Sequence, residues 1–443
     1  MKKVRLGCGA GYSGDRIDPA VELARFGNLD YLVFECLAER TIAIAQQNKR
    51  TGVSEGYDPL LVERMQAVLP YCGPNRVKII SNMGAANPIA AAKKTREIAR
   101  SLEFNGLRIA AISGDDVLCH MPGDYMFMET GTPVRSVADR IVSANAYLGA
   151  APIVAALAAG ADVVLTGRAA DPSLFLAPLI HEFGWNTSDW NLLGQGTVTG
   201  HLLECAGQLT GGYFADPGYK DVPRLARLGF PLAEVSADGS ATLTKVDGSG
   251  GCLTRATCIE QLMYEIQDPS SYITPDVIAD FSGVQIEDLG HDRVRATGGA
   301  GRCKPDNLKV SVGFNDGWIG EGQISYAGPG AVARARLAEQ ILAERLRSCT
   351  LGELRFDLIG INSIHGEMTP QHTCEPWEVR LRAVARANLR EHAAMVPREV
   401  EALYTNGPAG GGGVSTSILE TIAILSTLIP AGLPQPSIHF EVS

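Results

Sequence analysis

Two pairs of ionisable residues in the sequence could move protons. Asp115 and Asp116 are adjacent and follow the apolar run 107–112; neighbouring carboxylates can separate their pKa values or bind Mg²⁺ together. His201 and Glu204 are three residues apart, which places both side chains on one face of a helix. Glu204 could then orient the imidazole for general acid–base catalysis. A metal site remains an alternative for both pairs, as do a capped loop for the first and a structural hydrogen bond for the second.

Arg168, Asp171 and Asn82 are predicted to contact a substrate or anion. Arg168 follows the apolar run 162–166, and Asp171 comes three residues later. An arginine that a carboxylate holds in place can clamp an anionic group in a fixed orientation, although the same two residues could form a buried ion pair. Asn82 follows another apolar run, 77–81, so the end of a second strand would carry it.

The glycine-rich segment Gly9–Gly14 matches the pattern G-x-G-x-x-G, and Glu35 follows about 20 residues later. This combination is typical of dinucleotide binding, in which the glycines let the backbone approach a pyrophosphate and the acid binds a ribose. Asp15 departs from the pattern because it sets a carboxylate beside the expected pyrophosphate. An NAD(P)- or FAD-linked oxidoreductase is therefore an alternative function, and Gly9 and Gly11 are predicted to bind a substrate or anion.

A second glycine run, near the end of the chain, comprises Gly410, Gly411, Gly412 and Gly413. It precedes a predicted helix over 415–428, and converging backbone N–H groups at a helix N-terminus favour an anion. No lysine follows, so the run is not a Walker A loop. We predict that it anchors a phosphate, a CoA moiety or a carboxylate; a tight structural turn is the alternative.

The elements that position these residues alternate between strands and helices in the first half of the chain. This alternation predicts an α/β fold with a mostly parallel, Rossmann-like sheet flanked by helices over residues 1–220. Ligands bind such sheets at the carboxyl ends of the strands, where the candidate residues lie. The predicted strands are 4–8, 31–34, 77–81, 107–112 and 162–166; the predicted helices are 19–26, 37–47, 59–69, 88–102, 143–158 and 172–183.

The second half, residues 221–443, has a different pattern, in which hairpins mix with helices. It predicts an α+β domain with a mixed or antiparallel sheet, and the boundary is expected near 217–223. The predicted strands are 233–235, 241–245, 284–287, 292–297, 308–314 and 319–326; the predicted helices are 255–265, 331–348, 376–388 and 415–428.

The composition narrows the function classes. A net charge of -10 without a basic cluster argues against nucleic-acid binding. None of the ten cysteines forms a C-x-x-C pair, which argues against structural zinc. The most apolar segment, 144–165, is interrupted by Gly149, Pro152, Gly160 and Asp162, so no membrane span is expected. Because the first residues lack a signal-peptide pattern, we expect a cytoplasmic protein. We also expect it to form a homo-oligomer and to act on a small molecule.

Several segments together resemble the acyclic terpene utilisation (AtuA-like) family. They spread over nearly the whole chain, and their combination is specific. The matching segments are Leu29–Thr41, Asn82–Pro88, Leu165–Leu179, Glu204–Pro217, Thr274–Phe281 and Glu401–Gly413.

The resemblance implies that the protein acts in the same metabolism as enzymes that process branched acyl-CoA compounds. The CoA moiety of the substrate is therefore the expected bound group. It supplies no catalytic residue. With no nucleophile elbow in the sequence, we expect acid–base chemistry on an acyl-CoA or another anionic carboxylate, of hydratase, lyase or isomerase type. A divalent metal ion stays open as a cofactor. The remaining alternative is a non-catalytic ligand-binding or scaffold subunit.

Overall fold

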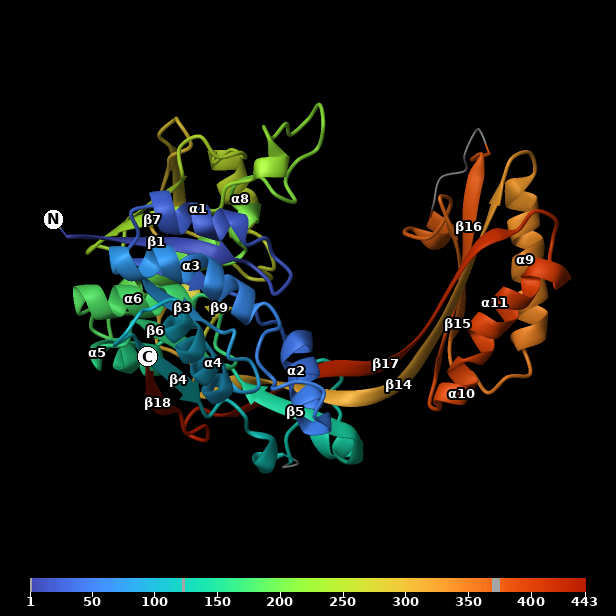
Figure 1. The fold of residues 1–443 in the computed structure, drawn as a ribbon, viewed down its shortest axis with the longest axis horizontal. Coiled ribbons are helices and arrows are strands. Elements are labelled where there is room, and N and C mark those ends of the chain that lie inside the picture. Colours follow the sequence, from blue (N-terminus) through green and yellow to red (C-terminus); the bar gives the residue numbers. More distant parts are fainter. Residues whose placement is uncertain (1, 122–123, 369–374) are drawn as a thin grey trace. The chain divides into compact units, whose positions relative to one another are not determined.

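The computed structural model describes residues 2–121, 124–368 and 375–443, and the chain divides into two compact units (Figure 1). Unit 1 comprises residues 1–313 and 424–443, and unit 2 comprises residues 314–423. Two long strands, β14 (Asn307–Ala327) and β17 (Gly412–Pro430), contain the points where the chain leaves unit 1 and returns to it. The predicted boundary near residue 220 lies within unit 1.

A ten-stranded sheet forms the centre of unit 1 and confirms the predicted α/β class. Its parallel part has the order β1-β2-β3-β6-β4, and antiparallel strands extend it on both sides. The parallel strands are β1 (Lys3–Ala10), β2 (Tyr31–Phe34), β3 (Lys78–Ser81), β6 (Val163–Thr166) and β4 (Arg108–Ser113). The antiparallel strands are β7 (Pro231–Ser236), β8 (Ala241–Lys245), β12 (Val294–Thr297), β11 (Gln285–Asp288) and, beside β4, β18 (Ser437–Val442).

Helices cover both faces of the parallel strands. All four residues of β2 are buried, as expected for a continuous apolar run in a parallel sheet that is covered on both sides. One group of helices that pack together is α1 (Asp18–Phe26), α3 (Leu61–Asn75) and α4 (Pro88–Ser101). Another group is α5 (Ala151–Ala158), α6 (Ser173–Phe183), α7 (Trp190–Glu204) and α8 (Arg255–Leu262).

Smaller elements complete unit 1. Helix α2 (Glu39–Thr51) packs against β5 (Ile141–Ala146), and α7 packs against a three-stranded sheet. At that contact a Cβ on Gly194 would lie against the backbone of Ala300, so the helix can approach the strand only because residue 194 is glycine. The three strands are β9 (Tyr272–Ile273), β10 (Ile278–Asp280) and β13 (Ala300–Arg302).

Unit 2 contains an antiparallel sheet with helices on one face. The strand order is β15-β16-β14-β17, and β16 alternates buried and exposed side chains as a strand with one covered face does. A separate apolar core joins the sheet to the helices. The remaining elements are β15 (Leu354–Ile359), β16 (Glu378–Ala387), α9 (Ala331–Leu346), α10 (Arg390–Ala393) and α11 (Met395–Asn406).

Three predicted helices are wrong. Segments 376–388 and 415–428 are strands β16 and β17, and segment 143–158 divides into strand β5 and helix α5. Long-range pairing decided the first two, because β14 pairs with both strands and satisfies their backbone groups. The third is divided near Gly149, whose missing side chain leaves room for the carboxylate of Asp276. That carboxylate accepts from the amide of Ala150 at 2.9 Å, just before α5 begins.

Candidate functional site

A cavity of about 780 Å³ lies in unit 1, at the carboxyl ends of β1, β2 and β6. This is the edge of the sheet at which the sequence predicts a site. The remaining walls are formed by residues 36–41, the end of α7 with the loop that follows it, residues 225–230 and residues 264–265. The ionisable carboxyl and guanidinium groups of the lining are Asp15, Arg16, Glu35, Glu39, Arg168, Asp171, Glu204 and Glu265.

The glycine-rich loop after β1 forms one wall. The carboxylate of Asp15 accepts from the amide of Gly11 at 2.9 Å and from the amide of Arg16 at 3.0 Å. A dinucleotide pyrophosphate would need such loop amides, and here a side chain of the loop uses them. A Cβ on Gly11 would lie 2.5 Å from the carbonyl carbon of Cys205, so glycine permits the loop to touch the end of α7. Gly9 packs under the ring of Phe34 and does not line the cavity.

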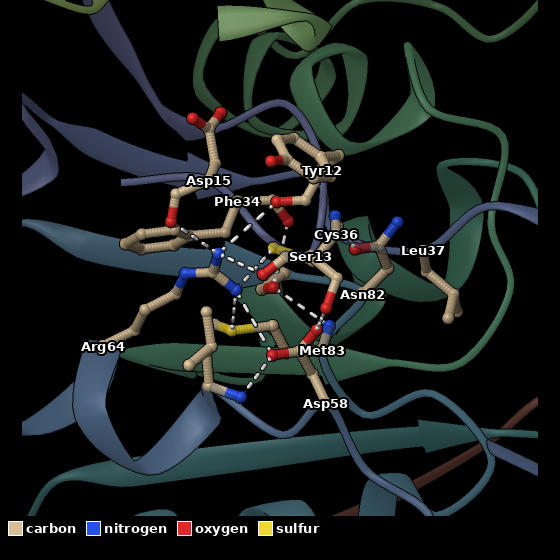
Figure 2. A network of polar contacts seen from close by, with 12 residues as sticks. Tyr12, Ser13, Asp15, Phe34, Cys36, Leu37, Asp58, Arg64, Asn82 and Met83 are labelled. Atoms are coloured by element: carbon tan, nitrogen blue, oxygen red, sulfur yellow. Dashed lines mark hydrogen bonds and ion pairs between the residues drawn. The ribbon is translucent and has the colours of Figure 1, made fainter. Parts of the chain in front are cut away.

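The buried guanidinium of Arg64 on α3 holds this loop in place by hydrogen bonds to its backbone, as Figure 2 shows. It donates to the carbonyl of Ser13 at 2.7 Å and, at longer range, to those of Tyr12 and Asp15. It also pairs with Asp58 at 3.2 Å, and Asp58 accepts from the hydroxyl of Ser13 at 2.6 Å. The wall is therefore fixed by a buried ion pair, which the sequence pattern did not indicate.

Arg168, at the end of β6, is fully buried. It donates to the carbonyl of Leu37, and its Nη1 lies 3.1 Å from a carboxylate oxygen of Asp171. Its guanidinium carbon lies 4.2 Å from the ring centre of Tyr147. Burial alone would lower the pKa of Arg168, but Asp171, Tyr147 and nearby glutamates raise it, so the group stays charged. The structure thus contains the ion pair that the sequence left as an alternative to the clamp.

Glu35, at the end of β2, is held by Asn82. The Glu35 carboxyl accepts from the Asn82 side-chain amide at 2.8 Å and from the amide of Leu37 at 2.8 Å. The carbonyl oxygen of the Asn82 side chain accepts from the amide of Cys36 at 2.7 Å. Burial, followed by the negative charge of Asp171, raises the pKa of Glu35 to about 8. Asn82 therefore supports a proton-carrying carboxyl group from outside the cavity lining.

Glu204, the last residue of α7, lines the cavity, whereas its neighbour His201 does not. The Nδ1 of His201 lies 2.8 Å from Oε1 of Glu204, and the imidazole packs against the rings of Tyr272 and Phe281. Burial raises the pKa of Glu204 well above its usual value and lowers that of His201 to about 4, so it favours the uncharged form of both groups. The pair predicted from sequence exists, and it presents the carboxyl group rather than the imidazole.

Asp115 and Asp116 follow β4 and are not part of the cavity lining. Asp115 accepts from the side-chain amide of Asn145 at 2.8 Å and from the backbone amide of Arg168 at 2.8 Å. Burial raises its pKa to about 6. Asp116 accepts from the side chain of Gln46 at 3.2 Å. Asp115 thus holds in position the backbone that carries Arg168.

The glycine run at Gly410–Gly413 belongs to unit 2, and no helix follows it. Gly410 and Gly413 have positive φ, and Gly412 begins strand β17. The predicted helix N-terminus is absent, so the physical basis for an anion anchor is lost. The tight turn that the sequence left as the alternative describes this segment.

Glu39 is a cavity residue that sequence reasoning missed. Its carboxylate pairs with the hydroxyl of Tyr147 and lies 3.2 Å from Nζ of Lys309. Burial opposes its ionisation, but the charge of Arg168 and these partners lower its pKa to about 2. No local signal could have found it, because its partners stand more than a hundred residues away in the sequence. Glu265, which also lines the cavity, was missed as well.

Two further properties concern metals and membranes. Within residues 2–121, 124–368 and 375–443, no three His, Cys, Asp or Glu side chains are grouped as metal ligands would be. None of the helices in that part of the chain has the length and apolar character of a membrane-spanning segment.

The fold and the cavity define the class: an α/β protein with buried, proton-carrying carboxyl groups at the carboxyl ends of its parallel strands. The chain matches the family model described as acyclic terpene utilisation family protein AtuA over residues 4–440, and it belongs to this family. The resemblance is thereby confirmed, and membership implies a role in acyclic terpene utilisation. No curated protein and no solved structure was found to match the chain.

Proposed function

We propose that this protein is an enzyme that moves protons on a small acyl compound, an acyl-CoA or another carboxylate, during acyclic terpene utilisation. One observation carries the proposal: Glu35 and Glu204, two carboxyl groups whose pKa values are raised by burial, line the same cavity. Carboxylic acids that remain protonated near neutral pH are suited to general acid catalysis.

A third acid, Asp171, influences the pKa values of both Glu35 and Glu204. Asp171 lies close enough to both acids for its charge to raise their pKa values, so each acid retains its proton more readily than it would without that charge. In this scheme Glu204 and Glu35 donate and accept protons at neighbouring positions of an acyl chain. That division of labour fits a hydratase, lyase or isomerase.

The alternative of a dinucleotide-linked oxidoreductase has less support. Asp15 uses the loop amide of Gly11 that a pyrophosphate would need. Oε1 of Glu35 already accepts from Asn82 and Leu37, so this oxygen is not free for a ribose. A non-catalytic subunit would have no need of two protonated carboxyl groups in one cavity, since each is costly to bury.

The test incubates the purified chain with saturated and α,β-unsaturated branched acyl-CoAs at pH 7 and analyses the products by chromatography and mass spectrometry. We expect a product that differs by one water, by cleavage or by double-bond position, which separates the three reaction types. Glu204→Gln and Glu35→Gln should each lower kcat by about 10²–10⁴-fold. Glu63→Gln, at an exposed position of α3, is the matched control.

Two results would contradict the proposal. Unchanged turnover in both cavity variants would remove the carboxyl groups from the reaction. Conversion that occurs only when NAD(P)H is added would favour the oxidoreductase. If the reaction needs the acid form of Glu35, activity should fall as the pH rises through about 8.

A further inference from the structure

The positive charge of the buried arginine of the cavity is already neutralised. Arg168 pairs with Asp171, and Arg16, the other basic residue among the described residues of the lining, donates to the carbonyl of Ala226 at 3.1 Å. The charge of Arg168 is therefore balanced inside the cavity before any ligand arrives. A ligand carboxylate would have to displace Asp171 to pair with it.

Further negative charge surrounds this ion pair. Glu39 is ionised, because its pKa is lowered to about 2, and the exposed carboxylate of Glu265 raises the pKa of Glu204 by repulsion. An incoming anion would meet the same repulsion and would also lose its hydration. The repulsion and the lost hydration both disfavour the binding of a free carboxylate beside this ion pair.

Three buried polar atoms of the lining have no hydrogen-bond partner in the described part of the chain: Nε of Arg168, Oε2 of Glu204 and Oδ1 of Asp171. The Asp171 oxygen lies 3.1 Å from Nη1 of Arg168 within the ion pair, so the other two atoms are the ones left for a ligand. The Nε atom carries a proton, and burial raises the pKa of Glu204, which favours a carboxyl group whose O–H can point away from His201. Buried donors without partners are uncommon and require an explanation. A carbonyl oxygen has two lone pairs and can accept from two such donors.

We propose that the cavity selects an uncharged acyl carbonyl, as in a thioester, whose oxygen accepts hydrogen bonds from Arg168 Nε and the Glu204 carboxyl group, and that it excludes the free acid. This inference rests on the proposed function and narrows its substrate class. Donors aimed at a carbonyl oxygen also stabilise the charge that develops there when a neighbouring carbon loses a proton. The Arg168 clamp expected from sequence thus becomes a carbonyl-binding site.

The experiment compares three probes by calorimetric titration of the full chain at pH 7: geranic acid, its N-acetylcysteamine thioester and its CoA thioester. The N-acetylcysteamine thioester carries no charge, so it separates recognition of the acyl carbonyl from recognition of CoA phosphates. We expect both thioesters to bind at least about tenfold more tightly than the free acid, a difference of about 1.4 kcal/mol.

Variants of two acids sharpen the comparison. Asp171→Asn leaves the charge of Arg168 unbalanced, so it should strengthen binding of the free acid by about tenfold or more and change thioester binding little. Glu265→Gln, at an exposed position of the lining, should act in the same direction more weakly and does not depend on the buried ion pair. Glu63→Gln should change neither ligand. Circular dichroism establishes that each variant is folded.

The outcomes separate the two proposals. Equal or tighter binding of the free acid to the natural chain would overturn the carbonyl selection and leave acid–base chemistry on a carboxylate standing. If neither Asp171→Asn nor Glu265→Gln binds the free acid more tightly than the natural chain does, the negative charges of the cavity do not exclude the free acid. That result would overturn the charge-based explanation of the selectivity. Failure of all three probes to bind, together with unchanged turnover in Glu204→Gln, would remove both this inference and the proposed function.

Discussion

At the residue scale, the charges and hydrogen-bond partners around a buried carboxyl group decide its pKa. Glu35, Glu39 and Glu204 line one cavity, yet the pKa values of two of them are raised and that of Glu39 is lowered. The difference follows from their partners, since Glu39 has Arg168, Tyr147 and Lys309 beside it and Glu204 has mainly acids. The same side chain therefore supplies a fixed charge at one position and a transferable proton at another.

The raised pKa of Glu35 predicts a pH-dependent stability. The folded state keeps this proton up to a pH of about 8, whereas the unfolded chain releases it near its ordinary pKa of 4.5. Folding is therefore weakened as the pH rises from about 4.5 to 8, by at most about 1.4 kcal/mol per pH unit. Glu35→Gln can accept the same two hydrogen bonds and cannot ionise, so its advantage over the natural chain should grow with pH.

Thermal unfolding at pH 5, 6.5 and 8 measures this difference. We expect the variant and the natural chain to melt at similar temperatures at pH 5 and the variant to melt higher at pH 8. Glu63→Gln, which lies at the surface, should track the natural chain throughout. A constant offset between variant and natural chain at all three pH values would show that Glu35 ionises in the folded state as it does in the unfolded one.

At the element scale, the cavity depends on how α3 holds the loop between β1 and α1. The side chain of Arg64, on α3, donates to three carbonyl groups of this loop (Figure 2). Burial raises the pKa of its partner Asp58 despite the ion pair, so the desolvation of that carboxylate outweighs its attraction to Arg64. The pair thus fixes the geometry of the loop more than it adds to stability.

Arg64→Met should therefore destabilise unit 1 by about 3–5 kcal/mol, because it leaves the Asp58 carboxylate buried without its cation. Adding Asp58→Asn to this variant should recover part of the loss, since the uncompensated charge is removed. Urea unfolding of the two single variants and the double variant gives the coupling energy. Lys94→Met, which removes an exposed ion pair with Glu97, serves as the control. Additive losses in the double variant would show that Arg64 and Asp58 act separately.

At the scale of the whole molecule, unit 2 is an insertion between two strands that also belong to unit 1. The amide of Ala431 donates to the carbonyl of Asp306 at 2.9 Å, and the hydroxyl of Thr421 donates to the carbonyl of Asp316 at 3.2 Å. As residue numbers rise along β14, those of the partners in β17 fall, so the two strands run antiparallel. Each unit has its own apolar core.

A chain in which residues 318–419 are replaced by Asn-Gly should therefore fold. The two strands would be joined by a two-residue hairpin, for which Asn-Gly is the preferred turn. We expect cooperative unfolding and retained binding of the thioester probe, because every residue of the cavity lining belongs to unit 1. Calorimetric unfolding and titration measure both properties. A shortened chain that folds and no longer binds would show that unit 2 contributes to the site.

The sequence by itself determined the alternation of strands and helices in residues 1–220 and the edge of the sheet at which the cavity lies. Its short spacings also indicated that Arg168 could pair with Asp171 and His201 with Glu204. These features follow from local periodicity and short spacings, which act within a few residues. Only the tertiary structure decided that 376–388 and 415–428 are strands, since pairing with β14 outweighs their local preference. It also decided which acids share a cavity and carry protons, because burial and distant charges set their pKa values.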